Sequence, residues 1–514
     1  MNGARALLET LKASGVEVCF ANPGTSEMQL VAALDEVDGI RAVLGLFEGV
    51  VTGAADGYGR MADKPAVTLL HLGPGLANGL ANLHNARRGG SPIVNLVGDH
   101  ADYHLYLNSP LTSDIEGLAR PVSDWVHRAT SADDLAEAGA AAVAIAHEGA
   151  GRIATVIVPA NHAWSGDAIS APPRPTDARA TVAPDVIERA ADALRNARMP
   201  CLFVGGRALR EDAMLAAGRV ATATGARIVC ETFATRHQRG AGRVAVEKLP
   251  YFGEEAQAFL AEFDAIVYCG ADAPVSFFAY PGKPSILAPD TALSVRLASK
   301  RQNHLHALSA LADALGAPAE TDRLQRAGTP PVEEGKLTPV NAGAIIAEML
   351  PDDAIVSDEG ATSSFAAFAQ SAGAARHDWL QLTGGAIGQG LPVAIGAAIA
   401  CPNRKVIALQ ADGSAMYTNQ ALWTMARERL DIVTILFNNR SYAILNIEMT
   451  RVGAQTPGPK AKAMLNLREP DIQWRTLAES MGVEATTATT TEEFRASLGR
   501  ALARKGPVLI EAMI

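Results

Sequence analysis

Short apolar strands alternate with helical patterns along the whole chain, and this alternation constrains the fold more than any other feature. In the first third, RAVLGLF, AVTLLHL and PIVNLV read as strands, and helices are expected at VVTGAADGYGRMA and LANGLANLHNARR. Later segments repeat the pattern with PCLFVGG, ARIVCETF, AIVYCG, AIVSD, KVIALQ and IVTILFNN as strands. This alternation predicts an α/β protein of doubly wound parallel sheets covered by helices on both faces. Such sheets bind ligands at the carboxyl ends of their strands.

Length and composition predict three domains. A chain of 514 residues is too long for one core. Two segments, roughly 168–185 and 316–338, are rich in Pro, Ala and polar residues, as linkers are. We therefore expect domains at 1–167, 185–320 and 338–514.

Charge and cysteine usage exclude several classes of protein. The net charge is −10 and no long Lys/Arg run is present, which argues against nucleic acid or a membrane surface as a partner. No run of 18 apolar residues suggests a membrane span, and the first residues do not read as a signal peptide. None of the five cysteines forms a CxxC pair. We therefore expect buried thiols in a cytoplasmic protein.

The segment ADGSAMYTNQALWTMARERLDIVTILFNNRSYA is the most informative part of the chain. A right-handed crossover between its two flanking strands places Asp412 and Asn439 on one edge of the sheet. Their side-chain oxygens and the carbonyl of Ser441 form a hard oxygen set suited to Mg²⁺, which also takes phosphate oxygens. Gly413 and Ser414 add backbone N–H groups near a helix start, where an anion is favoured. The alternative is an ordinary strand-end turn with Asx caps.

With these residues the chain resembles thiamine-diphosphate-dependent enzymes of the acetolactate-synthase-like and benzoylformate-decarboxylase-like family, whose diphosphate motif begins with GDG and ends with NN. The first Gly is replaced by Ala411. The resemblance covers nearly the whole chain. It implies a pyrimidine-binding domain, a central Rossmann-like domain and a diphosphate-binding domain in that order, with thiamine diphosphate and Mg²⁺ as cofactors. Its metal ligands would be Asp412, Asn439 and Ser441, and its cofactor contacts would include Gly413, Ser414, Asn439 and Tyr442.

A second signal lies near the N-terminus, in NPGTSE and LFEGVVTGAADGYGR. In the family resembled, a Glu at the position of Glu48 hydrogen-bonds the aminopyrimidine ring and helps to activate the cofactor, which itself carries the carbanion chemistry. His71 matches a proton-transferring histidine of benzoylformate-decarboxylase-like members, and Thr25 aligns with a substrate-contacting serine. A helix-capping Glu and a structural strand-end His are the alternatives.

Two more segments match the cofactor site of that family. GGAIGQGLPVAIGAA resembles the stretch beneath the thiazolium ring, with Gly385 and Ile387 against the cofactor. Thr362 or Ser363, after the strand AIVSD, is a candidate donor to the diphosphate. Core packing of Ile387 and simple helix capping by the hydroxyl groups remain open. Three residues after another strand lie either at the site or in a solvated loop: Asp99, His100 and His104.

The resemblance also implies a partner subunit. In this family the two cofactor-binding domains act across a dimer interface, so Glu48 of one subunit would meet Asp412 of the other. Homotetramers are common.

The sequence specifies the reaction less closely than it specifies the cofactor site. We expect a decarboxylase or carboligase of 2-oxo acids without FAD. AILNIEMT lacks the Trp of acetolactate synthases, the chain stops at GPVLIEAMI without their C-terminal arm, and CLFVGGRALRED lacks GxGxxG. An apolar lining from Phe277, Phe278 and Tyr280 would favour a bulky or aromatic substrate. The alternatives are a true acetolactate synthase, a cofactor-binding paralogue without turnover, and a nicotinamide oxidoreductase.

Overall fold

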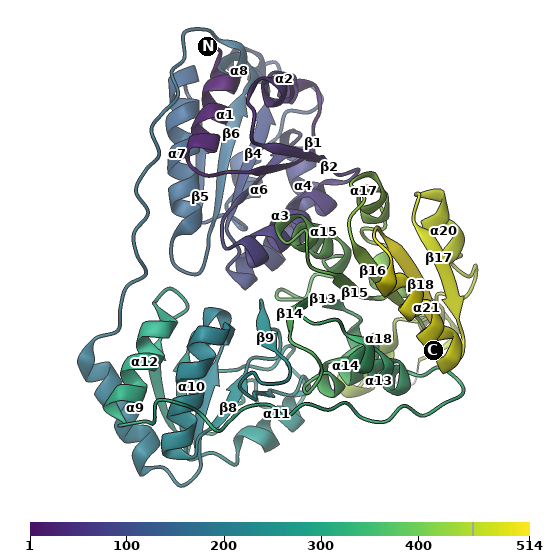
Figure 1. Cartoon of the computed structure of the whole chain (residues 1–514). Coiled ribbons are helices and arrows are strands. Elements are labelled where there is room, and N and C mark those ends of the chain that lie inside the picture. Colours follow the sequence, from purple (N-terminus) through teal and green to yellow (C-terminus); the bar gives the residue numbers. More distant parts are fainter. Residues whose placement is uncertain (455–456) are drawn as a thin grey trace.

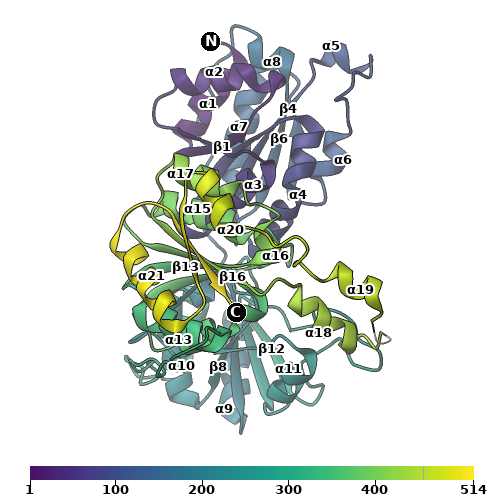
Figure 2. The ribbon, with the colours of Figure 1, turned by 90° about the vertical axis from the view of Figure 1, so that its right-hand side faces the viewer.

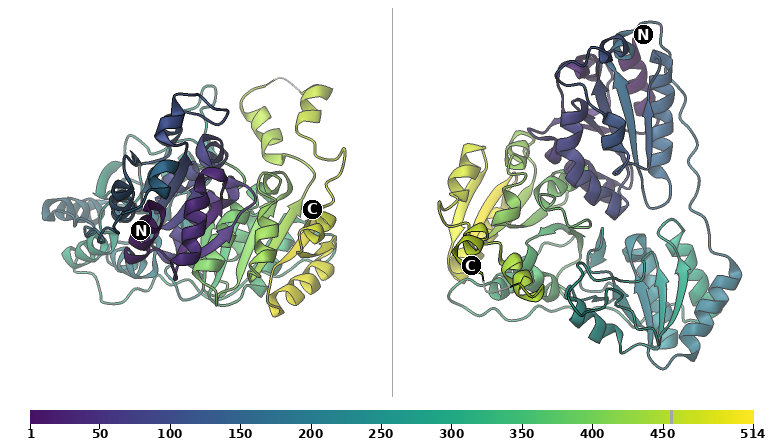
Figure 3. Two further views of the ribbon diagram at one scale, coloured as in Figure 1. Left: turned by 90° about the horizontal axis from the view of Figure 1, so that it is seen from above. Right: turned by 180° about the vertical axis from the view of Figure 1, so that it is seen from behind.

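The computed structural model describes residues 1–454 and 457–514 and contains three sheets, each covered by helices. Figure 1 shows the N-terminal unit at the top, the central unit at the lower left and the C-terminal unit at the right. The view from behind in Figure 3 shows the same three bodies and the long strand-free segment that joins the first to the second. The α/β fold predicted from the strand–helix alternation is confirmed.

The N-terminal unit is a six-stranded parallel sheet in the order β2-β1-β3-β4-β6-β5. Its strands are β1 (Val18–Asn22), β2 (Arg41–Leu44), β3 (Ala66–Leu70), β4 (Ile93–Asp99), β5 (Trp125–Arg128) and β6 (Ile153–Pro159). Its helices are α1 (Gly3–Ala13), η1 (Thr25–Glu27), α2 (Met28–Glu36), α3 (Glu48–Ala62), α4 (Leu72–Gly89), α5 (Asp102–Leu105), α6 (Ile115–Ala119), α7 (Ala132–His147) and α8 (Ala160–Trp164).

The central unit is a five-stranded parallel sheet in the order β10-β8-β7-β11-β12. Its strands are β7 (Pro200–Val204), β8 (Arg227–Cys230), β10 (Glu247–Lys248), β11 (Ala265–Cys269) and β12 (Leu293–Ala298). Its helices are α9 (Pro184–Asn196), η2 (Gly206–Leu209), α10 (Glu211–Thr224), α11 (Gly253–Leu260) and α12 (His304–Ala314).

The C-terminal unit is a seven-stranded sheet in the order β17-β18-β16-β15-β13-β14-β9. Its own strands are β13 (Ala354–Glu359), β14 (His377–Gln381), β15 (Val406–Ala411), β16 (Ile432–Asn438), β17 (Glu484–Ala488) and β18 (Val508–Met513). Its helices are α13 (Pro339–Met349), η3 (Ala361–Ser363), α14 (Phe365–Gln370), α15 (Gly390–Ala400), α16 (Asp412–Ala415), α17 (Ala421–Arg427), α18 (Ala443–Arg451), α19 (Pro459–Met464), α20 (Trp474–Ser480) and α21 (Thr491–Ala503).

One edge strand departs from the expected parallel arrangement. Strand β9 (His237–Arg239) belongs to the central segment of the chain but runs antiparallel to β14 at the edge of the C-terminal sheet. Arg239 is buried there, its Nη1 donates to the Phe368 carbonyl at 2.6 Å, and its guanidinium lies 3.8 Å from the Phe368 ring centroid. A polar three-residue strand has no apolar alternation, so the sequence pattern gave no sign of it.

The N-terminal and C-terminal units share one hydrophobic core. Helices α3 and α15 pack directly against each other, as Figure 1 shows at its centre, and one buried apolar cluster contains residues from both units. Small residues allow this close approach, because a side chain on Gly57 would collide with the backbone of Val393. None of the helices in the described ranges is long and apolar enough to cross a membrane. The five cysteines are free thiols, four of them buried.

Candidate active site

The carboxyl ends of β15 and β16 bring Asp412 and Asn439 to the same edge of the C-terminal sheet. The two strands pair in parallel, so the residues that follow them lie side by side. Asp412 is only 2% exposed, and its carboxylate accepts hydrogen bonds from the N–H groups of Gly413 at 2.9 Å and Arg440 at 2.7 Å. Burial raises the pKa of Asp412. The two bonds fix the carboxylate at the sheet edge.

The two adjacent asparagines have different surroundings. Asn438 is buried, and its Nδ2 donates to Glu511 at 2.7 Å. Asn439 is half-buried, and its Oδ1 accepts from the Ser441 N–H at 2.9 Å, across a left-handed turn at Arg440 (φ +56°). Asn438 therefore anchors the turn, and Asn439 is the less buried of the two asparagines.

The chemistry of this donor set fits Mg²⁺. In the ranges 1–454 and 457–514, no group of three or more His, Cys, Asp or Glu side chains is arranged to hold a metal. A cation held by Asp412, Asn439 and the Ser441 carbonyl would have one carboxylate and two neutral oxygens from the protein. Such a set leaves room for phosphate oxygens and water, as Mg²⁺ prefers, and lacks the nitrogen and sulfur ligands typical of zinc.

Tyr442, Ser414 and helix η3 surround this edge. A side chain at Gly413 would collide with the Tyr442 ring, so the glycine is needed for that ring to lie against the turn. The Ser414 hydroxyl points inward and donates to the Ala411 carbonyl at 3.1 Å. Helix η3, which carries Thr362 and Ser363, contacts β15 and α18. The structure therefore gathers these predicted residues at one edge.

Glu359 is a key residue that the sequence analysis missed. It is buried at the end of β13, and its carboxylate accepts from the N–H groups of Gly388 at 2.7 Å, Gln389 at 3.1 Å and Gly390 at 2.8 Å. The side-chain amide of Gln410 donates to it at 2.5 Å. Burial raises the pKa of Glu359, although these bonds act in the opposite direction. The carboxylate thus fixes residues 388–390 of the Gly-rich loop, and its position directly before GATSS was the available signal.

The outer part of this loop faces aromatic side chains of the central unit. Gly385 has a φ of +78°, and a Cβ there would lie 2.6 Å from Cζ of Phe277. Ile387 is half-buried, and none of the apolar clusters in the described part of the chain includes it. The core-packing alternative for Ile387 therefore loses its support, and the side chain remains available to a ligand.

Glu48 begins α3 and is 6% exposed. Asn78 of α4 donates to its Oε2 at 2.9 Å. A Cβ on Gly75 would lie 3.0 Å from Glu48 Oε1 and 3.4 Å from the Cβ of His71. Glu48 and His71 are thus close neighbours, separated only by the bare glycine backbone.

His71 is paired with a second missed residue, Glu27. The His71 Nδ1 lies 2.7 Å from Oε2 of Glu27, which also accepts from the Gly24 N–H at 2.8 Å. The Glu27 side chain is fully buried, and burial raises its pKa. Thr25 is exposed in the same short helix. NPGTSE therefore supplies both the exposed Thr25 and the carboxylate that orients His71.

Asp99, His100 and His104, at and after the end of β4 in the N-terminal sheet, have at least one structural role among them. Asp99 is buried and pairs with Arg128 at 2.5 Å, so it is not a free acid. His100 Nε2 lies 3.0 Å from the Ser109 hydroxyl, and the rings of His100 and His104 are 5.4 Å apart. The two histidines form a half-buried pair after β4, with His104 in the short helix α5.

A buried network joins the units behind the loop 384–390. Asp56 binds Arg60 through two bonds of 2.7 Å and accepts from Gln389 at 2.6 Å. Arg60 in turn donates to the Gln381 carbonyl at 2.7 Å and the Thr235 carbonyl at 3.3 Å. All three units of the chain are thus connected through one buried ion pair.

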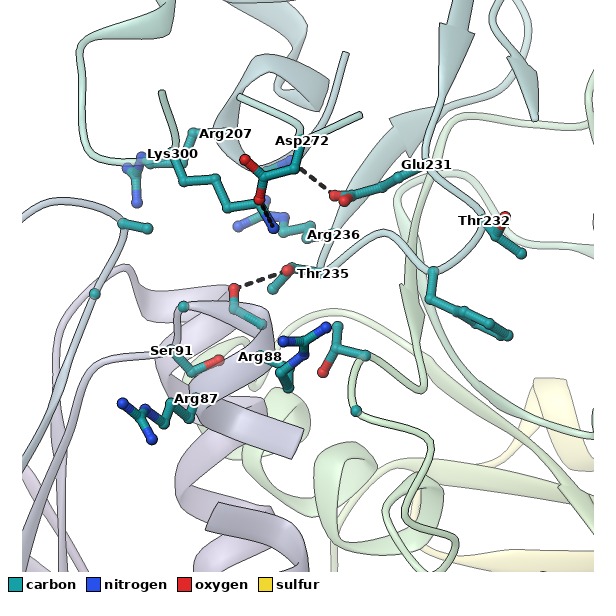
Figure 4. A pocket seen from close by; sticks show the side chains of 18 of the residues that line it. Arg87, Arg88, Ser91, Arg207, Glu231, Thr232, Thr235, Arg236, Asp272 and Lys300 are labelled. Carbon is teal, nitrogen blue, oxygen red and sulfur yellow. Dashed lines mark hydrogen bonds and ion pairs between the residues drawn. The ribbon is translucent and has the colours of Figure 1, made fainter. Parts of the chain in front are cut away.

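A cavity of about 740 Å³ lies between the three units, at the carboxyl ends of the central strands. Figure 4 shows Arg207, Lys300 and Glu231 on its central wall, with Arg87 and Arg88 of α4 on the opposite wall. Its lining is rich in cations although the chain has a net charge of −10. Arg and Lys side chains of the lining include Arg60, Arg87, Arg88, Arg152, Arg207, Arg210, Arg236, Lys300 and Arg301.

Comparisons with known proteins agree with this arrangement. Residues 1–118 match the family model "Thiamine pyrophosphate enzyme, N-terminal TPP binding domain", and residues 358–512 match "Thiamine pyrophosphate enzyme, C-terminal TPP binding domain". The second match contains Glu359, the Gly-rich loop, Asp412 and Asn439.

Full-length relatives are also found. A Mycobacterium tuberculosis protein named "Putative acetolactate synthase large subunit IlvX" is 50% identical, over 100% of this chain and 99% of the relative. A benzoylformate decarboxylase of Pseudomonas aeruginosa is 28% identical, over 98% and 97% of the two chains. The solved structure of a thiamine diphosphate-dependent 4-hydroxybenzoylformate decarboxylase from Rhodococcus jostii RHA1 superposes with a TM-score of 0.87 at 27% identity, covering 99% of this chain and 98% of that one.

Proposed function

The chain belongs to the thiamine pyrophosphate enzymes, and from that premise we propose that it decarboxylates or ligates 2-oxo acids with thiamine diphosphate and Mg²⁺ and without FAD. The observation that carries the proposal is that the candidate cofactor residues come together in two groups. Asp412 and Asn439 lie together at one sheet edge, and Glu48 lies beside His71 at another.

In this proposal, Asp412, Asn439 and the Ser441 carbonyl bind Mg²⁺ and through it the diphosphate. Backbone N–H groups at Gly413 and Ser414, with Thr362 or Ser363, bind the phosphate oxygens. Bound thiamine diphosphate supplies a nucleophilic carbon and an electron sink next to the substrate carbonyl. The Gly-rich loop, with Gly385 and Ile387, supports the ring system, and Tyr442 packs at the diphosphate end.

Glu48 and His71 handle protons. Glu48 is held by Asn78 and shares a proton with the aminopyrimidine ring. His71 is oriented by Glu27, whose carboxylate fixes which ring nitrogen carries the proton. The free Nε2 is then the atom that exchanges a proton with the substrate, and Thr25 binds the substrate's polar group.

The central loop after β11 supplies the substrate selectivity. Phe277 reaches the Gly-rich loop, and the rings of Phe233 and Phe277 are 5.7 Å apart between centroids. Phe278 is 52% exposed beside Phe277. Tyr280 is buried and directs its hydroxyl away to Glu448, so it is not a lining residue. An aromatic wall of this kind favours a bulky or aromatic 2-oxo acid over pyruvate.

The turn after β7 supports a reaction without FAD. It lacks GxGxxG, and the first turn of α10 carries Glu211 and Asp212, which disfavour a phosphate at that helix start. The test is direct: the purified protein should show no flavin absorbance.

We also propose that the active unit is at least a homodimer and is expected to be a homotetramer. Large apolar side chains are exposed directly beside both halves of the site: Leu46 precedes Glu48, and Met416 and Tyr417 follow Asp412. Exposed apolar groups around a site are typical of a subunit interface. A protein that sediments as a monomer in analytical ultracentrifugation and is fully active under the same conditions would contradict this assembly.

The second candidate is acetolactate synthesis from pyruvate, which the name of the 50% identical relative favours. The absence of Trp from residues 440–454 argues against it. A panel of pyruvate, 2-oxobutyrate, branched 2-oxo acids, benzoylformate and phenylpyruvate, scored for aldehyde, acyloin and acetolactate, decides between them. Rapid acetolactate formation by a flavin-loaded protein would overturn the proposal, and loss of all turnover would favour a cofactor-binding paralogue.

A further inference from the structure

Helix α18 has no buried residue, yet it follows directly after the turn that carries Asn439 and Ser441. Seen from above, the yellow-green pair α18 and α19 stands away from the three sheets (Figure 3). Leu445 and Ile447 are 45% and 40% exposed. Burial of apolar surface therefore does little to fix this helix, and other contacts must define its position.

Those contacts join α18 to the central unit. The Tyr280 hydroxyl donates to Oε2 of Glu448 at 2.7 Å. One turn further along, Arg451 forms an ion pair with Glu254 at the start of α11. Figure 2 shows α11 and α18 as neighbours on one side of the molecule. We call these four residues, Tyr280, Glu448, Arg451 and Glu254, the clasp.

Aromatic rings shield the clasp. The Arg451 guanidinium lies 4.3 Å from the Phe252 ring centroid and 5.1 Å from that of Tyr280. The Tyr280 side chain is 9% exposed. Burial, and then the hydrogen bond to Glu448, raises the pKa of Tyr280. The hydroxyl therefore remains a donor to the carboxylate under ordinary conditions, and a hydrogen bond to a charged group in such surroundings is stronger than a neutral one.

The clasp also holds the loop that carries Phe277. The Ser276 N–H donates to the Ser285 carbonyl at 2.8 Å, so residues 276–285 form a closed loop with Tyr280 near its tip. Lys283 of this loop pairs with Glu254. The loop is thus fastened at its tip to α18 and to α11, while Phe277 at its base touches Gly385.

We propose that Glu448 and Arg451 are positioning residues that keep Phe277 against the Gly-rich loop and thereby select 2-oxo acids with aromatic side chains. The selectivity part rests on the proposed function. Neither residue touches the reacting atoms in this scheme. They act by restricting the Phe277 ring to one position, so that the planar side chain of an aromatic substrate binds in a preformed pocket.

The variants Tyr280→Phe and Glu448→Ala remove the hydrogen bond, and Glu448→Gln keeps an acceptor for it. We expect the ratio of kcat/KM for benzoylformate to that for pyruvate to fall about tenfold in the first two, the lower end of the range for one charge-assisted hydrogen bond. The ratio should be partly restored in Glu448→Gln, whose amide oxygen accepts the bond without a charge. The double variant Tyr280→Phe/Glu448→Ala should fall no further than either single variant, because both remove the same bond.

Two matched control variants remove a Tyr–Glu hydrogen bond and an Arg–Glu ion pair outside the clasp. Tyr58→Phe breaks a Tyr–Glu hydrogen bond of 3.1 Å to Glu17, and Arg495→Met breaks an Arg–Glu pair of 2.6 Å to Glu348. Neither should alter the selectivity ratio. Arg451→Met should lower it like Glu448→Ala.

A second readout needs no turnover. Hydrogen–deuterium exchange should rise at residues 273–286 and 443–451 in the clasp variants and stay at the wild-type rate in the controls. Unchanged exchange in both segments overturns the clasp. Raised exchange with an unchanged selectivity ratio overturns its role in selectivity. If the wild type turns over no 2-oxo acid, the proposed function fails, while the exchange rates still decide whether the clasp exists.

Discussion

Replacing Glu359 by Gln tests whether one buried carboxylate organises the Gly-rich loop. Oε1 accepts the N–H groups of Gly388 and Gln389, and Oε2 accepts those of Gly390 and the Gln410 amide. In the variant one oxygen becomes an NH₂ group. The Gln410 amide can rotate to accept from it, but the Gly390 N–H then has no acceptor.

A buried N–H without an acceptor costs about 1–3 kcal/mol. We therefore expect the ordered loop to be destabilised by about 2 kcal/mol, which corresponds to thiamine diphosphate binding weakened by up to about thirtyfold. Amide exchange at 388–390 is the direct measurement, and titration calorimetry gives the affinity. Asp264→Asn, which alters a carboxylate bound to two backbone N–H groups in the central unit, is the control. Wild-type exchange at 388–390 in Glu359→Gln would refute the reasoning.

The same substitution has a pH signature. Burial raises the pKa of Glu359 above its ordinary value of 4.5. The folded state therefore favours the protonated group. Its contribution to stability is complete below the unfolded pKa and is lost as the pH rises through the folded pKa. Gln cannot ionise, so the difference in urea midpoint between wild type and variant should shrink as the pH rises through that window, and a constant difference would contradict the raised pKa.

Three further substitutions test the cofactor site. Asp412→Ala should abolish thiamine diphosphate binding in calorimetry, because the diphosphate loses its bridging cation; wild-type affinity would remove Asp412 from the metal site. Glu48→Gln should keep most of the binding but lose proton exchange at thiamine C2, followed by NMR without substrate, and normal turnover would refute the role of Glu48. Gly75→Ala places a methyl group 3.0 Å from Glu48 Oε1 and should lower kcat more than cofactor affinity, whereas an unchanged kcat would show that the carboxylate can shift freely.

Local sequence patterns were sufficient to predict the positions of the candidate residues that directly follow buried strands. Asp412 and Asn439 could be placed together because parallel strands end at one edge and a crossover joins neighbours. His71 followed from the same rule. Residue type could not, however, distinguish the two adjacent asparagines. Asn438 is an anchor only because β18, far along the chain, brings Glu511 next to it.

The residues that the sequence could not reveal are those whose partners come from a distant part of the chain. Glu359 reads as an ordinary strand-end acid until the Gly-rich loop, about thirty residues later, turns its N–H groups toward it. Tyr280 lies in an apolar stretch that favours a pocket lining, yet its hydroxyl meets Glu448, 168 residues away, and the ring leaves the pocket. A tyrosine can either line a pocket with its apolar ring or turn away so that its hydroxyl finds a hydrogen-bond acceptor. The position of the available acceptor decides between these two orientations. The same reasoning underlies the proposed selectivity, in which the position of Phe277 depends on the hydrogen bond that Tyr280 makes near the tip of the same loop.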